Sequence, residues 1–221
     1  MKEKIQIIVL SMFFVLLFSS ARTNTSSIRI WAPGVCSGDY FTYEMYGVYT
    51  FNHSNITIPI PDFEKNNNDW VRIAMSSTLG SIAYQVYTLH YLNENEISFN
   101  FQTDVNPENQ GNFKIYEKGV PICAANLNPG DRIPTAELFL NETITRTYLS
   151  GSRETNHASW NFSDDWGDIY FDRETGMLVE LCRTHKFGNL VTNEAVEKTD
   201  VIKLIATNRW HIASQQQTTA P

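Results

Sequence analysis

The sequence predicts an all-β domain in which antiparallel strands form a meander that curves into a half-barrel or a sandwich. Three observations lead to this fold class. Apolar and polar residues alternate with a period of two in several runs, which is typical of strands with one buried face. Helical periodicity is nearly absent. The connections between most runs are short, and no spacing suits a helix that crosses between parallel strands.

The predicted strands lie, in chain order, at residues 41–51, 71–76, 82–92, 96–105, 169–171, 177–181 and 201–208. The run 82–92 is apolar on both sides, which predicts a central strand covered on both faces. The clearest alternation is in 96–105, where we expect Ile97, Phe99 and Phe101 to face the core. The polar side chains of the same run should face water: Glu96, Ser98, Asn100 and Gln102.

One or two short helices and several turns complete the predicted fold. Proline and acidic residues at the start of 61–68 suit the first turn of a helix. The stretch 192–198 fits either a helical turn or the end of a strand, and the polar stretch 106–112 fits a loop. In the hairpin loop 172–176, Gly176 is expected to adopt the left-handed conformation that closes the turn.

The first 21 residues have the features of a secretory signal peptide. An apolar run of fourteen residues, Ile5 to Phe18, follows a charged start and precedes small residues, which predicts cleavage after Ala21. The alternative is a membrane anchor, but a helix of that length spans only about 21 Å of a hydrocarbon core of about 30 Å. We therefore expect a single secreted or cell-surface domain at residues 28–210, followed by a disordered tail at 211–221.

Composition excludes several classes of protein. Hydrophobic residues make up 42% of the chain, which is too many for a disordered protein. The 17 basic residues face 24 acidic ones, for a net charge of -7, so a nucleic-acid partner is not expected. The 3 cysteines are too few for a disulfide-dense scaffold.

Two kinds of covalent modification follow from the secretion signal. Five Asn-x-Ser/Thr sequons indicate a glycosylated surface: Asn24, Asn52, Asn55, Asn141 and Asn161. In an oxidising compartment, one pair among the three cysteines is expected to form a disulfide and leave the third thiol free. These residues are Cys36, Cys123 and Cys182. The sequence does not choose the pairing, and the alternative is that all three are small buried apolar residues.

The sequence contains no motif of a known catalytic or cofactor site. It has no glycine-rich phosphate loop, no His-Glu-x-x-His and no Gly-x-Ser-x-Gly. The stretch 104–108 begins like a calcium loop but lacks its glycine and its closing glutamate, and the acidic turn 164–168 fits a solvated turn better than a cation site. Cys182 and His185 are three residues apart, which places them on opposite faces of a strand. We therefore predict no catalytic residue, no metal ligand and no cofactor.

Aromatic side chains are the remaining functional signal, with 13 Phe, 10 Tyr and 5 Trp. Ordinary β-propensity and core packing explain most of them. The alternative is that the concave face of a curved sheet binds an apolar or sugar ligand. The residues assigned to such an apolar ligand face are Tyr43, Tyr84, Phe99, Phe101 and Trp160.

The segment from Tyr170 to Glu180 resembles an aromatic-Asp-x-x-Thr-Gly-x-Leu hairpin found in uncharacterised secreted β-rich proteins of archaea. It is also distantly similar to a hairpin of lipoprotein-carrier-like (LolA-like) half-barrels. The stretches 38–43, 126–131 and 146–156 resemble the same archaeal proteins. The resemblance implies a curved antiparallel sheet with an apolar groove. It implies no catalytic residue and carries no function over to this chain.

Three functions remain after these exclusions. The leading hypothesis is a non-catalytic secreted or cell-surface protein that acts as a binding or envelope module. The second is a carrier of an apolar, lipid-like ligand in the concavity of the sheet, which requires an apolar cavity of about 300 Å³ or more. The third is a secreted hydrolase, which requires a cleft where a nucleophile or an acid pair converges.

Overall fold

The computed structural model describes residues 29–52, 70–91, 95–109, 121–133, 138–148, 151–189 and 194–210. The chain divides into two compact units, Met1–Ile30 and Trp31–Pro221, and the fold below belongs to the second. The signal segment 1–21, the helix expected at 61–68 and the tail 211–221 lie outside the described residues. In the described ranges, no helix is long and apolar enough to cross a membrane.

The described residues form strands and turns, without a helix. The strands are β1 (Tyr40–Phe51), β2 (Trp70–Leu79), β3 (Ile82–His90), β4 (Glu96–Asp104), β5 (Glu142–Tyr148), β6 (Gly151–Phe162), β7 (Asp165–Asp172), β8 (Leu178–Asn189) and β9 (Glu194–Thr207). The ambiguous stretch 192–198 thus enters a strand from residue 194 onward. The predicted all-β class is confirmed.

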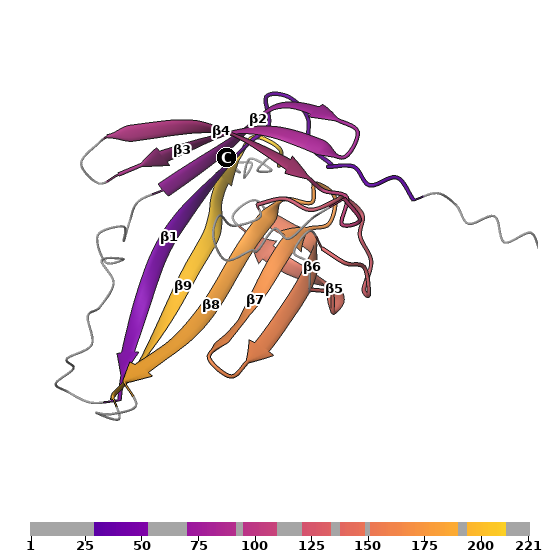
Figure 1. Ribbon diagram of the computed structural model, residues 1–221. Helices are drawn as coiled ribbons and strands as arrows, with labels where there is room; N and C mark the ends of the chain where they lie inside the picture. Colours follow the sequence, from indigo (N-terminus) through magenta and orange to yellow (C-terminus); the bar gives the residue numbers. More distant parts are fainter. Residues whose placement is uncertain are drawn as a thin grey trace, which may run out of the picture. The chain divides into compact units, whose positions relative to one another are not determined.

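All nine strands belong to one antiparallel sheet, in the order β4-β3-β2-β1-β9-β8-β7-β6-β5. Strands next to each other in the chain are neighbours in the sheet, as predicted, except that the long connection between β4 and β5 joins the two edges. The pairing of β1 with β9 unites a meander of four strands with a meander of five. Figure 1 shows that the sheet curves and remains open. Of the two predicted architectures, the half-barrel is therefore confirmed, because a sandwich needs two sheets.

One face of the sheet carries most of the buried side chains, and we call it the inner face. On this face, directly opposed residues of neighbouring strands lie side by side, for example Tyr43 with Leu204 and Ile169 with Leu181. The connection between β4 and β5 adds buried side chains to the same core cluster, among them Ile122. The alternation of side chains along each strand then places every second residue on the opposite, outer face.

The run predicted to be covered on both faces is β3, and it is covered unequally. Ala83, Gln85 and Tyr87 are buried on the inner face, whereas Tyr84 and Val86 on the outer face are half-buried. β3 lies next to the edge strand and not in the centre of the sheet. The described strands form no second sheet over this outer face, and its apolar residues are only half-buried.

The burial predicted for β4 is only partly correct. Glu96, Ser98, Asn100 and Gln102 are exposed, as predicted. Phe101 is half-buried, but Ile97 is 54% exposed and Phe99 is 43% exposed, so the prediction that these two lie in the core is wrong. The physical reason is position: β4 is an edge strand that pairs with β3 on one side only. An alternating pattern fixes which side chains share a face, but not whether anything packs on that face.

Candidate functional site

The hairpin that joins β7 to β8 is locked by the carboxylate of Asp172, which is 1% exposed. This carboxylate accepts hydrogen bonds from the Thr175 backbone N–H at 2.8 Å and from the Thr175 hydroxyl at 2.7 Å. Gly176 follows with a φ of 74°, and a Cβ there would collide with the carbonyl oxygen of Cys123. The Asp-x-x-Thr-Gly motif is thus explained by the geometry of this turn.

Asp172 also binds Arg153, which lies on β6. Nε of Arg153 donates to the Asp172 carboxylate at 2.8 Å and Nη2 donates at 3.1 Å. The same Nη2 donates to Glu174 at 2.9 Å, and the guanidinium lies 4.7 Å from the ring centre of Trp210. Burial alone lowers the pKa of Arg153, but its hydrogen bonds to Asp172 and Glu174 and their negative charges outweigh burial and raise the pKa. The guanidinium is therefore a fixed positive charge.

A second ion pair lies beside the first. Nη1 of Arg173 donates to Glu154 at 2.9 Å, and Nη2 donates to the side-chain oxygen of Asn128 at 3.2 Å. The backbone holds the same residues together, because the N–H of Arg173 donates to the carbonyl of Glu154 at 2.9 Å. Asn126 donates its own N–H to the carbonyl of Arg173 from a left-handed conformation, with a φ of 56°.

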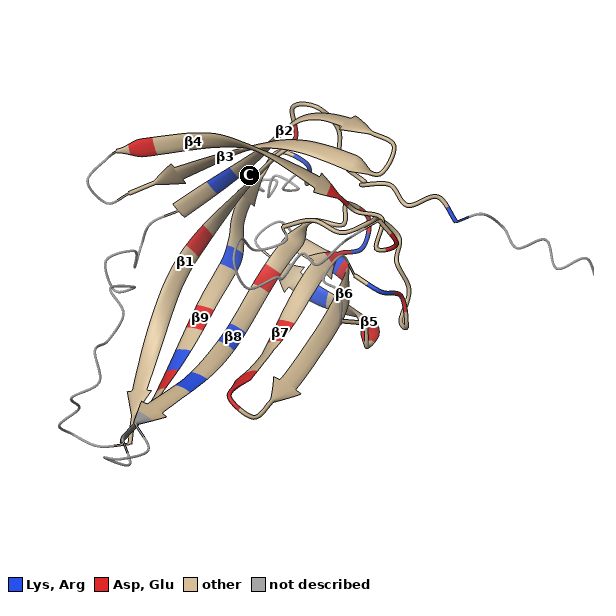
Figure 2. Ribbon diagram, in the orientation of Figure 1, with Lys and Arg blue, Asp and Glu red and all other residues tan. Residues whose placement is uncertain are grey.

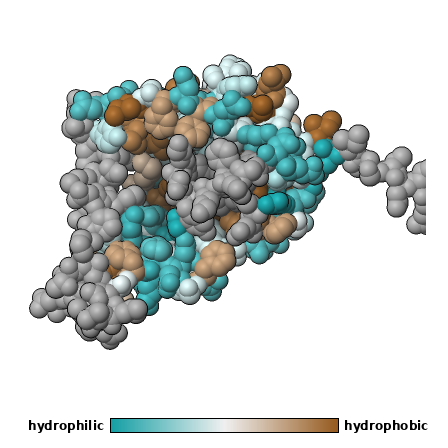
Figure 3. All heavy atoms as spheres, in the orientation of Figure 1, coloured by the Kyte–Doolittle hydropathy of each residue, from teal (hydrophilic) through white to brown (hydrophobic). Residues whose placement is uncertain are grey.

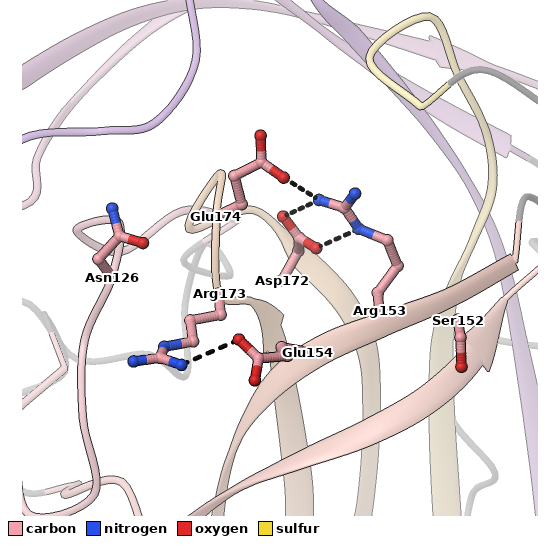
Figure 4. A pocket seen from close by; sticks show the side chains of 7 residues that line it. All are labelled: Asn126, Ser152, Arg153, Glu154, Asp172, Arg173 and Glu174. Atoms are coloured by element: carbon pink, nitrogen blue, oxygen red, sulfur yellow. Dashed lines mark hydrogen bonds and ion pairs between the residues drawn. The ribbon is translucent and has the colours of Figure 1, made fainter.

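These two ion pairs border a cavity of about 430 Å³ at the ends of β6 and β7. The residues that line it are Asn126, Ser152, Arg153, Glu154, Asp172, Arg173 and Glu174. Figure 4 shows the two groups of paired side chains, with Ser152 lying apart from both. All seven residues are polar or charged, and no histidine is among them. The cavity therefore offers hydrogen-bond donors and acceptors side by side, without a nucleophile beside a base.

The structure separates the five residues predicted to form one apolar ligand face. Tyr84 lies on the outer face, opposite to the others. Tyr43 is 1% exposed, and its hydroxyl donates to the carbonyl of Leu178 at 2.9 Å, so it is a core residue. Trp160 is buried on β6, where its indole N–H donates to Asp165 at 3.0 Å.

The remaining two residues of that predicted face do lie together. Phe99 and Phe101 form a cluster with Tyr87, with ring centres 5.1 to 6.1 Å apart. In Figure 3, apolar side chains show at the surface in the region of β3 and β4, which agrees with the exposure of Ile97 and Phe99. This cluster is separated by several strands from the polar cavity, which lies at the other half of the sheet.

The three cysteines are free thiols in the structure. Cys36 is exposed, with its Sγ 3.5 Å from a carboxylate oxygen of Asp39. Cys123 is buried, and burial raises the pKa of its thiol. Cys182 lies on the outer face of β8, where burial and the neighbouring Asp168 and Glu180 raise the pKa of the thiol. Because both pKa shifts are upward, the Cys123 and Cys182 thiols are protonated at neutral pH.

Three of the five sequons are described, and their asparagines are exposed. The side-chain oxygen of Asn52 accepts the Ala195 N–H at 2.7 Å, and that of Asn141 accepts the Ser159 N–H at 2.7 Å. Asn161 lies near the end of β6. In the first two, the bonded atom is the oxygen, whereas a glycan is attached through the nitrogen. The other two sequons, Asn24 and Asn55, lie outside the described residues.

The acidic stretches form structural contacts. Asp104 accepts the Asn106 N–H at 3.0 Å and the Asn109 side-chain N–H at 3.1 Å, which builds an ordinary turn. Asp165 pairs with Arg183 across the strands, and Asp168 pairs with His157. Within the described ranges, no group of three or more His, Cys, Asp or Glu side chains is close enough to hold a metal ion. Cys182 and His185 face opposite sides of β8, as their spacing predicts.

Sequence reasoning did not identify Arg153 as a site residue. Arg153 and Asp172 are nineteen residues apart, and no motif links them. The Asp-x-x-Thr-Gly hairpin was the one available signal, because a buried aspartate in such a turn needs a cation or several donors. The outer-face position of His157 was also missed, with Glu142 3.1 Å from Nδ1 and Asp168 2.8 Å from Nε2.

No protein-family model matches the chain, and no curated protein matches it.

Proposed function

We propose that the protein is a non-catalytic extracellular binding module that takes a neutral, polyhydroxylated ligand such as a short saccharide in the cavity between the ends of β6 and β7. The observation that carries this proposal is the lining of the cavity. Its volume of about 430 Å³ falls in the range of small-molecule sites, which is about 300 to 1,000 Å³. Sugar hydroxyls both donate and accept hydrogen bonds, and the lining offers both functions.

The charge balance of the lining favours a neutral ligand over an ionic one. Two arginines face three carboxylates, and each carboxylate already accepts from a guanidinium. An anion would have to displace a carboxylate from its arginine, which leaves that carboxylate without a partner. Figure 2 shows acidic and basic residues interspersed along β8 and β9. Such a surface does not concentrate charge of one sign.

The same lining supports binding over catalysis and over transport of a lipid. General acid or base catalysis needs a titrating group aimed at the reacting atom, whereas the carboxylates of the cavity are held by arginines. An apolar ligand would displace water from the charged groups of this lining and give no hydrogen bond in return. The cavity therefore gives the carrier hypothesis no support.

Secretion and glycosylation belong to the same proposal. The expected signal peptide and the exposed positions of Asn52, Asn141 and Asn161 support an extracellular glycoprotein. Intact mass measured before and after treatment with a peptide N-glycosidase tests this part, in a host that glycosylates. We expect a loss of mass and conversion of these asparagines to aspartates. An unchanged mass would contradict the glycosylation.

Calorimetric titration with a panel of neutral and anionic saccharides tests the binding function. We expect a neutral saccharide to bind and Arg173→Ala to weaken the binding at least tenfold, because a lost hydrogen bond to a charged group costs about 1.5 to 3 kcal/mol. Thr145→Ala is the matched control, since Thr145 is exposed on β5 and does not line the cavity. Thermal unfolding confirms that both variants fold. Binding that survives Arg173→Ala unchanged, or no binding by the whole panel, would overturn the proposal.

A further inference from the structure

The two edges of the sheet differ in how they are protected. A sheet edge presents backbone N–H and C=O groups that can pair with another strand, and proteins usually protect it with charges, proline or a bulge. The edge strand β5 carries Glu142 and Arg146. The edge strand β4 has no charge, proline or glycine from Ile97 to Thr103, and its pairing with β3 contains no bulge.

The β4 edge, to which no other described strand pairs, also carries exposed apolar side chains. Ile97 is 54% exposed and Phe99 is 43% exposed. The two residues are separated by one position, so they share the inner face of β4. Burying them would extend the cluster that Phe99 already forms with Tyr87, whose ring is stacked 5.4 Å away. A further strand paired with β4 would therefore bury these two side chains on the inner face.

We propose that β4 is a homodimer interface, in which β4 of a second copy pairs antiparallel to it around a two-fold axis at Ser98. This register places Ile97 of one copy opposite Phe99 of the other. Pairs of a β-branched and an aromatic residue are favourable across antiparallel strands. The interface contains the same pair twice, which is the self-complementarity that a two-fold contact requires.

When β4 pairs with a second copy of itself, charge favours Ser98 over Asn100 as the axis residue. With the axis at Ser98, Glu96 lies opposite the neutral Asn100 of the second copy. An axis at Asn100 would instead place Glu96 opposite Asp104, and like charges in directly opposed positions are destabilising. The strand is therefore compatible with itself in a register that buries both exposed apolar residues.

Site-specific crosslinking tests the register. In the full chain with Cys36→Ser, which removes the exposed thiol, Ser98→Cys places two cysteines opposite each other at the axis. Opposed Cα atoms in antiparallel strands are about 4.5 to 5.5 Å apart, which suits a disulfide. We expect mild oxidation to produce a covalent dimer on a non-reducing gel. The matched variant Asn100→Cys should give no covalent dimer on the same gel, because its two cysteines lie four positions apart along the paired strands.

Sedimentation velocity tests the association without a crosslink. Ser98→Lys brings two positive charges together at the axis, and we expect the dimer dissociation constant to rise at least tenfold. Asn100→Lys places the same charge opposite Glu96 of the second copy and should leave the dimer intact. Both positions are exposed, so neither change should affect folding. A wild-type chain that stays monomeric up to about 1 mM, or equal effects of the two lysine variants, would overturn the proposal. A dimer that forms equally well in Ser98→Lys would use another surface, and it would likewise overturn the proposal.

Discussion

Arg153 and Asp172 are joined by two hydrogen bonds, of 2.8 and 3.1 Å, although they come from different strands and lie nineteen residues apart. The carboxylate also holds both the N–H and the hydroxyl of Thr175. One nearly inaccessible side chain thus fixes the hairpin between β7 and β8 and places an arginine at the cavity. The stability of the hairpin and the geometry of the proposed site depend on the same group.

Asp172→Ala should lower the free energy of unfolding by about 3 kcal/mol, because it leaves the half-buried Arg153 charge with fewer partners and removes both bonds to Thr175. Denaturant unfolding followed by fluorescence measures this. Glu174→Ala is the control, since Glu174 is 65% exposed and its ion pair should contribute less than about 1 kcal/mol. Equal losses in the two variants would contradict the role assigned to Asp172.

Gly176→Ala should destabilise the protein more than Gly80→Ala does. Both glycines have a positive φ, of 74° and 60°, so both substitutions cost about 1 kcal/mol or more in backbone strain. A Cβ at Gly176 also meets the carbonyl oxygen of Cys123, whereas a Cβ at Gly80 meets nothing within 4 Å. The loss of unfolding free energy in Gly176→Ala minus the loss in Gly80→Ala gives the cost of the contact with the Cys123 carbonyl oxygen. A difference near zero would show that this contact has no cost.

Two buried tyrosines should respond in opposite ways to the loss of a hydroxyl. The hydroxyl of Tyr43 donates to the carbonyl of Leu178, so Tyr43→Phe should cost about 1 kcal/mol. The hydroxyl of Tyr87 is buried without a hydrogen-bond partner in the described part of the chain, so Tyr87→Phe should be neutral or stabilising. Thermal unfolding of both variants measures this. A larger loss in Tyr87→Phe would show that its hydroxyl has a partner.

The unfolding free energy should depend on Asp165 at acidic pH. Burial raises the pKa of Asp165, but hydrogen bonds from Arg183 and Trp160 outweigh it and hold the pKa below the usual 3.8. The unfolded carboxyl therefore binds its proton at a higher pH than the folded one does. The stabilisation is complete well above pH 3.8 and is lost as the pH falls through the folded pKa.

Asp165→Asn should accordingly be less stable than the wild type at pH 7 and should lose less stability between about pH 5 and pH 2. Denaturant unfolding across this pH range measures how steeply the free energy of unfolding changes with pH. The control is Asp164→Asn, because Asp164 is the exposed neighbour in the same turn. If the unfolding free energy of Asp165→Asn fell with pH as steeply as that of the wild type, Asp165 would not be the source of the loss of stability in acid.

Seven of the nine described strands could be predicted at least in part, because alternation is a local property, whereas β5 and β6 were not predicted. Gly176 could be predicted because its turn demands a positive φ. The exposure of Ile97 and Phe99 could not be predicted in the same way. It depends on β4 being an edge, which only the pairing of β1 with β9 decides. A repeat of two residues identifies a face, whereas burial requires a second element packed on that face.

The candidate site shows the same limit. The Asp-x-x-Thr-Gly hairpin is visible in the sequence, but the arginine that completes it comes from a separate strand. The aromatic residues gave a stronger signal in the sequence, but that signal did not lead to the cavity. Tyr43 and Trp160 are buried side chains that hydrogen-bond within the fold. A cavity lined by ion pairs leaves no spacing pattern, since its members are brought together by the pairing of β6 with β7.

The proposed binding of a neutral saccharide in the cavity beside Arg153 and Asp172 can be located residue by residue. The experiment is a nitrogen–proton NMR titration of the full chain with the saccharide that binds best in calorimetry. We expect saturable shifts of the backbone amides at 152–154 and 173–174, with Ile97 and Phe99 unchanged. Shifts confined to β3 and β4, or no saturable shift at the cavity, would contradict the claim.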